Sequence, residues 1–150
     1  MNSSRNQAGT LEAIKRCYDL EYLLLGDLRQ LLDERETAHT RKALLVTVDR
    51  LLLNLPLQLE LVSEEGYMSE VLEEFPNWHR QIEVLLCENK ACISRLGELR
   101  RRVGQELPFS AIGREVSFKL RKWMESLATI REREVQILQN AFALDIGGEA

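Results

Sequence analysis

Three polar side chains, each set in the middle of an apolar helical stripe, are the residues of this sequence best placed to do chemistry. The residues are Glu134, Gln58 and Asn89. Each lies in a series of leucine, isoleucine and valine residues spaced three and four positions apart, which is the spacing of one helix face. An unpaired carboxylate is costly to bury. Glu134 must therefore be paired, coordinated to a cation, protonated, or less buried than its stripe indicates.

Four long segments share this helical repeat, and no alternating strand pattern competes with it. The segments are residues 10–35, 40–64, 76–103 and 110–142. Thr10 and Ser110 are expected to cap the first and last helices, and Gly66 to end the second. Helices of this length with short connections predict an all-α fold, an antiparallel up-down-up-down four-helix bundle.

The bundle domain is expected to span residues 10–144. Residues 1–9 are polar and predict a disordered leader. Residues 145–150 include two adjacent glycines, which predict a C-terminal tail that does not continue the last helix.

Composition narrows the class of protein. Of 150 residues, 45% are hydrophobic and 29% charged, which is typical of a globular domain. The net charge of −4 argues against nucleic acid as a partner. The polar N-terminal residues do not resemble a signal peptide, and no apolar run is long enough to cross a membrane, so we expect a cytoplasmic protein. The three cysteines lack metal-binding spacing and are expected to be reduced.

Helix order places the three polar residues near one another. Mid-helix positions of antiparallel neighbours lie at similar heights, so Gln58, Asn89 and Glu134 are expected to meet in one layer. Such a layer is where a helical bundle would build a cofactor site. The alternative is that each residue acts independently to specify packing, as a buried asparagine does in a coiled coil.

Three segments of the chain resemble the ligand-bearing helices of the hemerythrin-like, or HHE cation-binding, family. The segments run from Leu57 to Met68, from Leu86 to Leu99 and from Ile130 to Gly147. A weaker match puts Asp19 and Leu20 where the family's first helix has an acidic residue and a histidine. The resemblance covers nearly the whole chain, and it implies a bundle whose inward imidazoles and carboxylates hold two iron ions.

The family's ligand types are mostly missing at the matching positions. The family's histidines fall on Leu20, Gln58, Asn89 and Ile130, and its glutamates fall on Val62 and Glu134. Only Glu134 keeps a type that ordinarily binds iron, and one carboxylate with two amides cannot supply a di-iron site. The resemblance therefore implies a degenerate metal site, and we expect no metal and no other cofactor. His39 and His79 are expected to lie outside this layer.

The preferred functional hypothesis is a non-catalytic bundle that has lost its di-iron site and acts as a structural or protein-interaction module. In it Gln58 and Asn89 donate hydrogen bonds to Glu134, which is either ionised or protonated. Its partner would be another protein or a second copy of the chain. The alternative is a metal-binding protein with a residual cation site at Glu134. We do not expect an enzyme, because no nucleophile motif or phosphate-binding loop is present.

Overall fold

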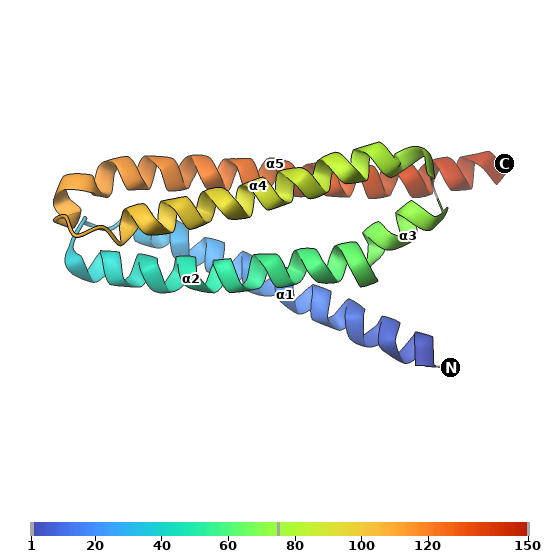
Figure 1. The fold of residues 1–150 in the computed structure, drawn as a ribbon, viewed down its shortest axis with the longest axis horizontal. Coiled ribbons are helices and arrows are strands. Elements are labelled where there is room, and N and C mark those ends of the chain that lie inside the picture. Colours follow the sequence, from blue (N-terminus) through green and yellow to red (C-terminus); the bar gives the residue numbers. More distant parts are fainter. Residues whose placement is uncertain (1, 75, 150) are drawn as a thin grey trace.

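A computed structural model describes the backbone of residues 2–74 and 76–149, and the side chains of residues 9–141 apart from 65, 67, 70, 72 and 75. Four long helices form an antiparallel up-down-up-down bundle, which confirms the predicted all-α fold (Figure 1). These helices are α1 (Asn2–Leu32), α2 (Ala38–Glu60), α4 (His79–Val103) and α5 (Phe109–Glu149). No strand occurs in the described residues.

The connection between α2 and α4 is itself helical. It consists of a π-helical turn, Leu61–Glu65, the short helix α3 (Tyr67–Glu74) and a 3₁₀ turn, Pro76–Trp78. Gly66 ends this π-helical turn, whereas α2 itself ends at Glu60, earlier than the predicted end of the second helix at Gly66. A Cβ atom on Gly66 would lie 2.8 Å from Ile14 Cδ1 and 3.0 Å from the Leu61 carbonyl oxygen. A larger residue would therefore crowd both Ile14 of α1 and the backbone of the turn, which favours glycine at this position.

Several helix ends differ from those predicted. Helix α1 begins at Asn2 and runs through Thr10, so the predicted cap there is wrong. Helix α5 begins at Phe109 and continues to Glu149, past the end predicted near residue 142. Glycine costs only about 1 kcal/mol relative to alanine in a helix, so two glycines disfavour a helix without forbidding it. The predicted boundaries at residues 9 and 144 thus have no counterpart in the helices.

The apolar stripes of the four helices meet in one core. Its fully buried members include Leu28, Leu44, Leu96 and Leu120, one from each long helix. Helix α1 packs on α2, α2 on α4 and α4 on α5, whereas α1 and α5 touch much less. Both chain ends lie at the same end of the bundle, as this topology requires (Figure 1). None of the helices in the described residues has a segment long and apolar enough to span a bilayer.

Candidate functional site

The three polar residues singled out in the sequence lie in one buried layer. Gln58 is 1% exposed, and Asn89 and Glu134 are each 4% exposed. They do not bond directly to one another as predicted. Each accepts a hydrogen bond from the guanidinium group of Arg131, which lies between them on α5.

Arg131 is hydrogen-bonded to all four long helices. Its Nη1 atom donates to Asn89 Oδ1 at 3.1 Å and to Glu134 Oε1 at 2.9 Å. Its Nη2 atom donates to Gln58 Oε1 at 3.1 Å and to Glu21 Oε1, on α1, at 2.7 Å. Its Nε atom donates to both oxygens of Glu21, at 3.1 and 3.2 Å. A guanidinium group has five N–H donors in a fixed plane, and here every one has an acceptor. These five residues are called the arginine network below.

A few contacts surround the arginine network. The Tyr18 hydroxyl donates to Glu134 Oε2 at 3.1 Å, and the Tyr18 ring centroid lies 5.5 Å from Arg131 Cζ, within the range of a cation–π contact. Asn89 Nδ2 donates to the Leu85 carbonyl at 2.8 Å. The buried Gln58 Nε2 atom has no acceptor among the described residues. Gln58 therefore acts in this layer as an acceptor, which orients its carbonyl oxygen toward the arginine.

The electrostatics of the layer keep Arg131 charged. Burial on its own would lower the pKa of the guanidinium group, because burial disfavours the charged form. The hydrogen bonds that Arg131 donates to Glu21 and the negative charges of Glu134 and Glu21 outweigh burial, so the pKa of Arg131 is raised above its already high ordinary value. The layer therefore contains a permanent cation supplied by the protein itself.

The remaining positions that match family ligands lie outside these hydrogen bonds. Val62 and Ile130 are buried apolar residues, at 1% and 4% exposure. Leu20 is 42% exposed, so it does not take the inward position that the resemblance implies for the histidine of the first helix. The next residue, Glu21, is 6% exposed and is the inward one. Cys17, Glu21, Leu24 and Leu28 have the spacing of one helix face, and so does the same series with Leu20 in place of Glu21. Leucine is the more hydrophobic of the two, so the sequence favours Leu20 as the residue that faces the core.

Sequence reasoning therefore missed Glu21 and Arg131. A signal for Arg131 was available, because it lies three residues before Glu134 and residues with this spacing face each other on a helix. An arginine that neutralises a buried carboxylate does not itself belong to the apolar stripe, so the apolar pattern does not identify it. Its long side chain starts beside the stripe and reaches over to it.

Metal chemistry has little support in this geometry. No group of three or more histidine, cysteine, aspartate or glutamate side chains in the described residues is arranged to hold a metal ion. Both oxygens of Glu134 accept hydrogen bonds, one from Arg131 and one from Tyr18. His79 is largely exposed and lies 3.2 Å from Glu83 on the surface of α4, and His39 is also exposed.

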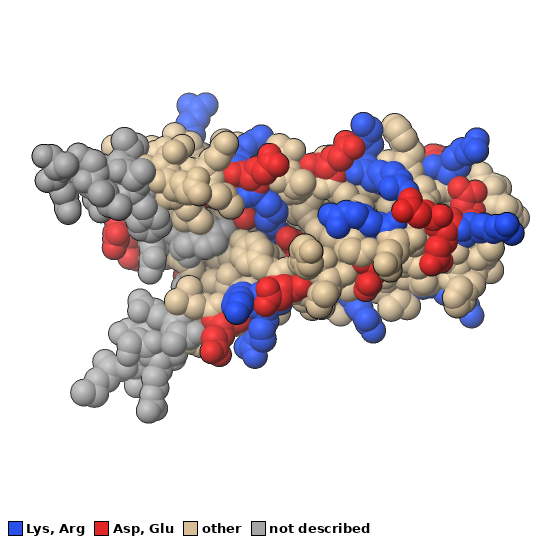
Figure 2. Space-filling view, turned by 180° about the vertical axis from the view of Figure 1, so that it is seen from behind, with Lys and Arg blue, Asp and Glu red and all other residues tan. Residues whose placement is uncertain are grey.

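A groove of about 430 Å³ lies over the arginine network between α1 and α5. Its walls are formed by Tyr18, Tyr22, Leu25, Val135 and Leu138, with Glu21, Arg131 and Glu134 also in its lining. Figure 2 shows this side of the molecule, where uncharged residues occupy much of the surface between rows of charged side chains. The opening follows from the small contact between α1 and α5. The 18% exposure of the Arg131 side chain shows that the network is nearly, but not fully, closed off from solvent.

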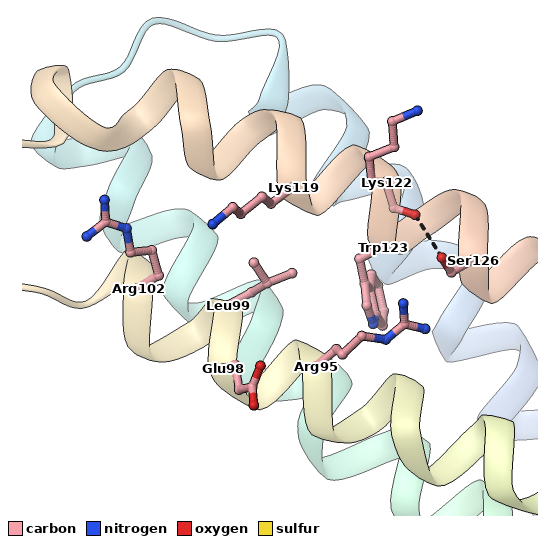
Figure 3. A pocket seen from close by; sticks show the side chains of 8 residues that line it. All are labelled: Arg95, Glu98, Leu99, Arg102, Lys119, Lys122, Trp123 and Ser126. Carbon is pink, nitrogen blue, oxygen red and sulfur yellow. Dashed lines mark hydrogen bonds between the residues drawn. The ribbon is translucent and has the colours of Figure 1, made fainter.

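A second hollow, of about 350 Å³, lies between α4 and α5 (Figure 3). Its lining includes four cationic side chains, namely Arg95, Arg102, Lys119 and Lys122. Arg102 and Lys119 both pair with Glu115, and Lys122 pairs with Glu125. Trp123 is buried and donates from Nε1 to the Cys92 carbonyl at 2.9 Å. Three of the four cationic side chains thus already have a carboxylate partner, and the indole ring is part of the core.

Comparisons of the chain with protein-family models, with curated proteins and with solved structures give no match.

Proposed function

We propose that this chain is a metal-free, non-catalytic relative of the hemerythrin-like bundles, in which Arg131 supplies the central positive charge that a metal site would otherwise provide. The protein then acts as a structural or protein-interaction module. The observation that carries the proposal is the position of the guanidinium group, hydrogen-bonded to one acidic or amide residue on each of the four long helices. The family's polar layer is kept, but its cation is covalently part of the chain.

The chemistry of the layer favours this reading over a residual cation site at Glu134. A divalent ion near Glu134 would lie beside a guanidinium group that stays charged, and like charges repel strongly at low dielectric. The same ion would have to displace two hydrogen bonds to reach the carboxylate oxygens. Gln58 and Asn89 already direct their carbonyl oxygens toward Arg131, which would compete with a metal ion for them.

The test compares the wild-type protein with Arg131→Gln, each purified without a histidine tag. Metal binding to the folded state must raise the thermal midpoint, so added iron(II) or zinc should leave the wild-type midpoint unchanged. In Arg131→Gln the carboxylates of Glu21 and Glu134 lose their counterion, and we expect added divalent metal to raise the midpoint.

The matched control is Arg133→Gln, which removes a more exposed arginine two residues away that pairs with Glu88. This variant should show no response to metal. A stoichiometric metal in the purified wild-type protein, or a saturable rise of its midpoint at micromolar metal, would contradict the proposal and favour the residual cation site.

A further inference from the structure

The outer face of the α1–α2 pair carries an unusual concentration of exposed apolar side chains. Leu20 and Leu23 on α1 are 42% and 62% exposed, and Val46, Leu53 and Leu57 on α2 are 52%, 76% and 50% exposed. Other exposed large apolar residues in the described part of the chain are spread over the remaining surface. Clustered apolar exposure of this kind marks an interaction surface, whereas single residues do not.

Helical spacing places these residues on two adjacent stripes. Residues three, four and seven apart share a helix face, which joins Leu20 and Leu23 on α1, and likewise Val46, Leu53 and Leu57 on α2. Asn54 Nδ2 donates to the Cys17 carbonyl at 2.8 Å and so sets the relative height of the two antiparallel helices. At about 1.5 Å per residue, Leu20 lies within roughly 3 Å of the height of Leu53. The five residues therefore form one continuous patch, called the α1–α2 patch below.

Each end of the patch has a basic residue on one helix and an acidic residue on the other, because α1 and α2 are antiparallel and each runs from a basic to an acidic residue. Arg16 and Asp27 lie four residues outside Leu20 and Leu23 on the same stripe of α1. Lys42 and Glu60 lie near the two ends of the α2 stripe. All four are exposed, and none forms an ion pair with another described residue.

This arrangement is complementary to itself. A twofold axis across the middle of the patch would place α1 antiparallel to α1 of a second copy, with Arg16 facing Asp27 and Lys42 facing Glu60. The midpoint of the α1 charges and the midpoint of the α2 charges differ by only about 2 Å in height, so one axis serves both pairs. Arg50 lies within the patch, and its long side chain can cover apolar surface while its charge reaches solvent.

We propose that the α1–α2 patch is the dimerisation surface of this protein, with a second copy of the chain bound antiparallel across a twofold axis. Isologous contacts of this kind are the commonest way in which identical chains associate. The patch faces outward and the arginine network lies in the core, so this proposal stands or falls separately from the proposed loss of metal.

The test is sedimentation equilibrium of the full chain over a range of micromolar concentrations. We expect a reversible monomer–dimer equilibrium for the wild-type protein. Leu53→Glu should weaken the dimer by about tenfold or more, because it buries a charge at the centre of the interface. Phe118→Glu is the matched control: Phe118 is 63% exposed on α5, outside the patch, and its replacement should leave the dimer unchanged. Circular dichroism checks that each variant stays folded.

The charge pattern gives a second test that fixes the orientation. Arg16→Glu creates two like-charge contacts per dimer and should weaken it, and adding Asp27→Arg should restore the wild-type affinity. A wild-type chain that stays monomeric at all concentrations would overturn the proposal. Rescue of Arg16→Glu by Glu60→Arg instead of Asp27→Arg would overturn the proposed arrangement, because it would place α1 against α2 of the second copy and not against α1.

Discussion

Replacing Arg131 by methionine removes the one charge that is hydrogen-bonded to all four helices while keeping a flexible, unbranched side chain at that position. Glu21 and Glu134, at 6% and 4% exposure, would then be buried without a counterion. Removing one partner of a buried ion pair costs about 3–5 kcal/mol. For a chain of this size a loss of 1 kcal/mol lowers the thermal midpoint by about 2–4 °C, so we expect a drop of roughly 6–20 °C. The bond from Tyr18 to Glu134 favours the lower part of this range.

The loss should also depend on pH. Folded Arg131→Met can relieve the buried carboxylates by taking up protons, so it binds more protons than its unfolded chain does. Its free energy of unfolding should therefore fall as the pH rises, and the gap to wild type should be wider at about pH 8 than at about pH 5. In the wild-type protein the pKa of Arg131 is raised, so its contribution is fully present throughout this range.

Urea unfolding followed by circular dichroism at both pH values measures these differences. Arg133→Met is the control, since the Arg133 and Glu88 side chains are 43% and 33% exposed and exposed pairs contribute about 0–1 kcal/mol. If Arg131→Met is no less stable than Arg133→Met at either pH, the reasoning that the network depends on a buried arginine is refuted.

Three further substitutions or reactions test other parts of the structure. Glu134→Leu removes one acceptor of Arg131 but leaves the hydrogen bonds from Arg131 to Glu21. Urea unfolding should therefore show a loss of about 1–3 kcal/mol in the free energy of unfolding, smaller than the loss in Arg131→Met. A larger loss than in Arg131→Met would mean that Glu134 is the main counterion. Gly66→Ala should lower the free energy of unfolding by about 1–3 kcal/mol, because its Cβ would contact Ile14 and the Leu61 carbonyl. Gly97→Ala has open space around it and should be neutral or stabilising. Equal effects of the two changes in thermal melts would contradict the packing at Gly66. Burial raises the pKa of the Cys17 and Cys92 thiols, whereas Cys87 is exposed. At pH near 8 a disulfide reagent should therefore modify Cys87 rapidly and the other two cysteines only on unfolding. A rapid reaction that persists in Cys87→Ser would show that a buried thiol is accessible.

The sequence alone determined the bundle and most of its core. Long apolar repeats at steps of three and four, with short connections, leave few ways to bury four helices, and the predicted antiparallel order is the one observed. Helix ends were less determined, because glycine and serine shift the local preference by only about 1 kcal/mol and neighbouring turns can override it. The long α5, which runs past two glycines, is an example.

The sequence also identified the level of the bundle at which Gln58, Asn89 and Glu134 meet, because mid-stripe polar residues on antiparallel helices reach similar heights. Only the tertiary structure decided what lies between them. Arg131 and Glu21 are adjacent in sequence to Ile130 and Leu20, and a single step along a helix turns a side chain by about 100°. The apolar pattern of a helix cannot show which of two adjacent residues points into the core when one of them is a long charged residue. That residue is buried only if another helix supplies an opposite charge close to it. Here Glu21 provides that charge, and its distance from Arg131 is set by the packing of α1 against the rest of the bundle, whereas Glu134 lies three residues further along the same helix as Arg131.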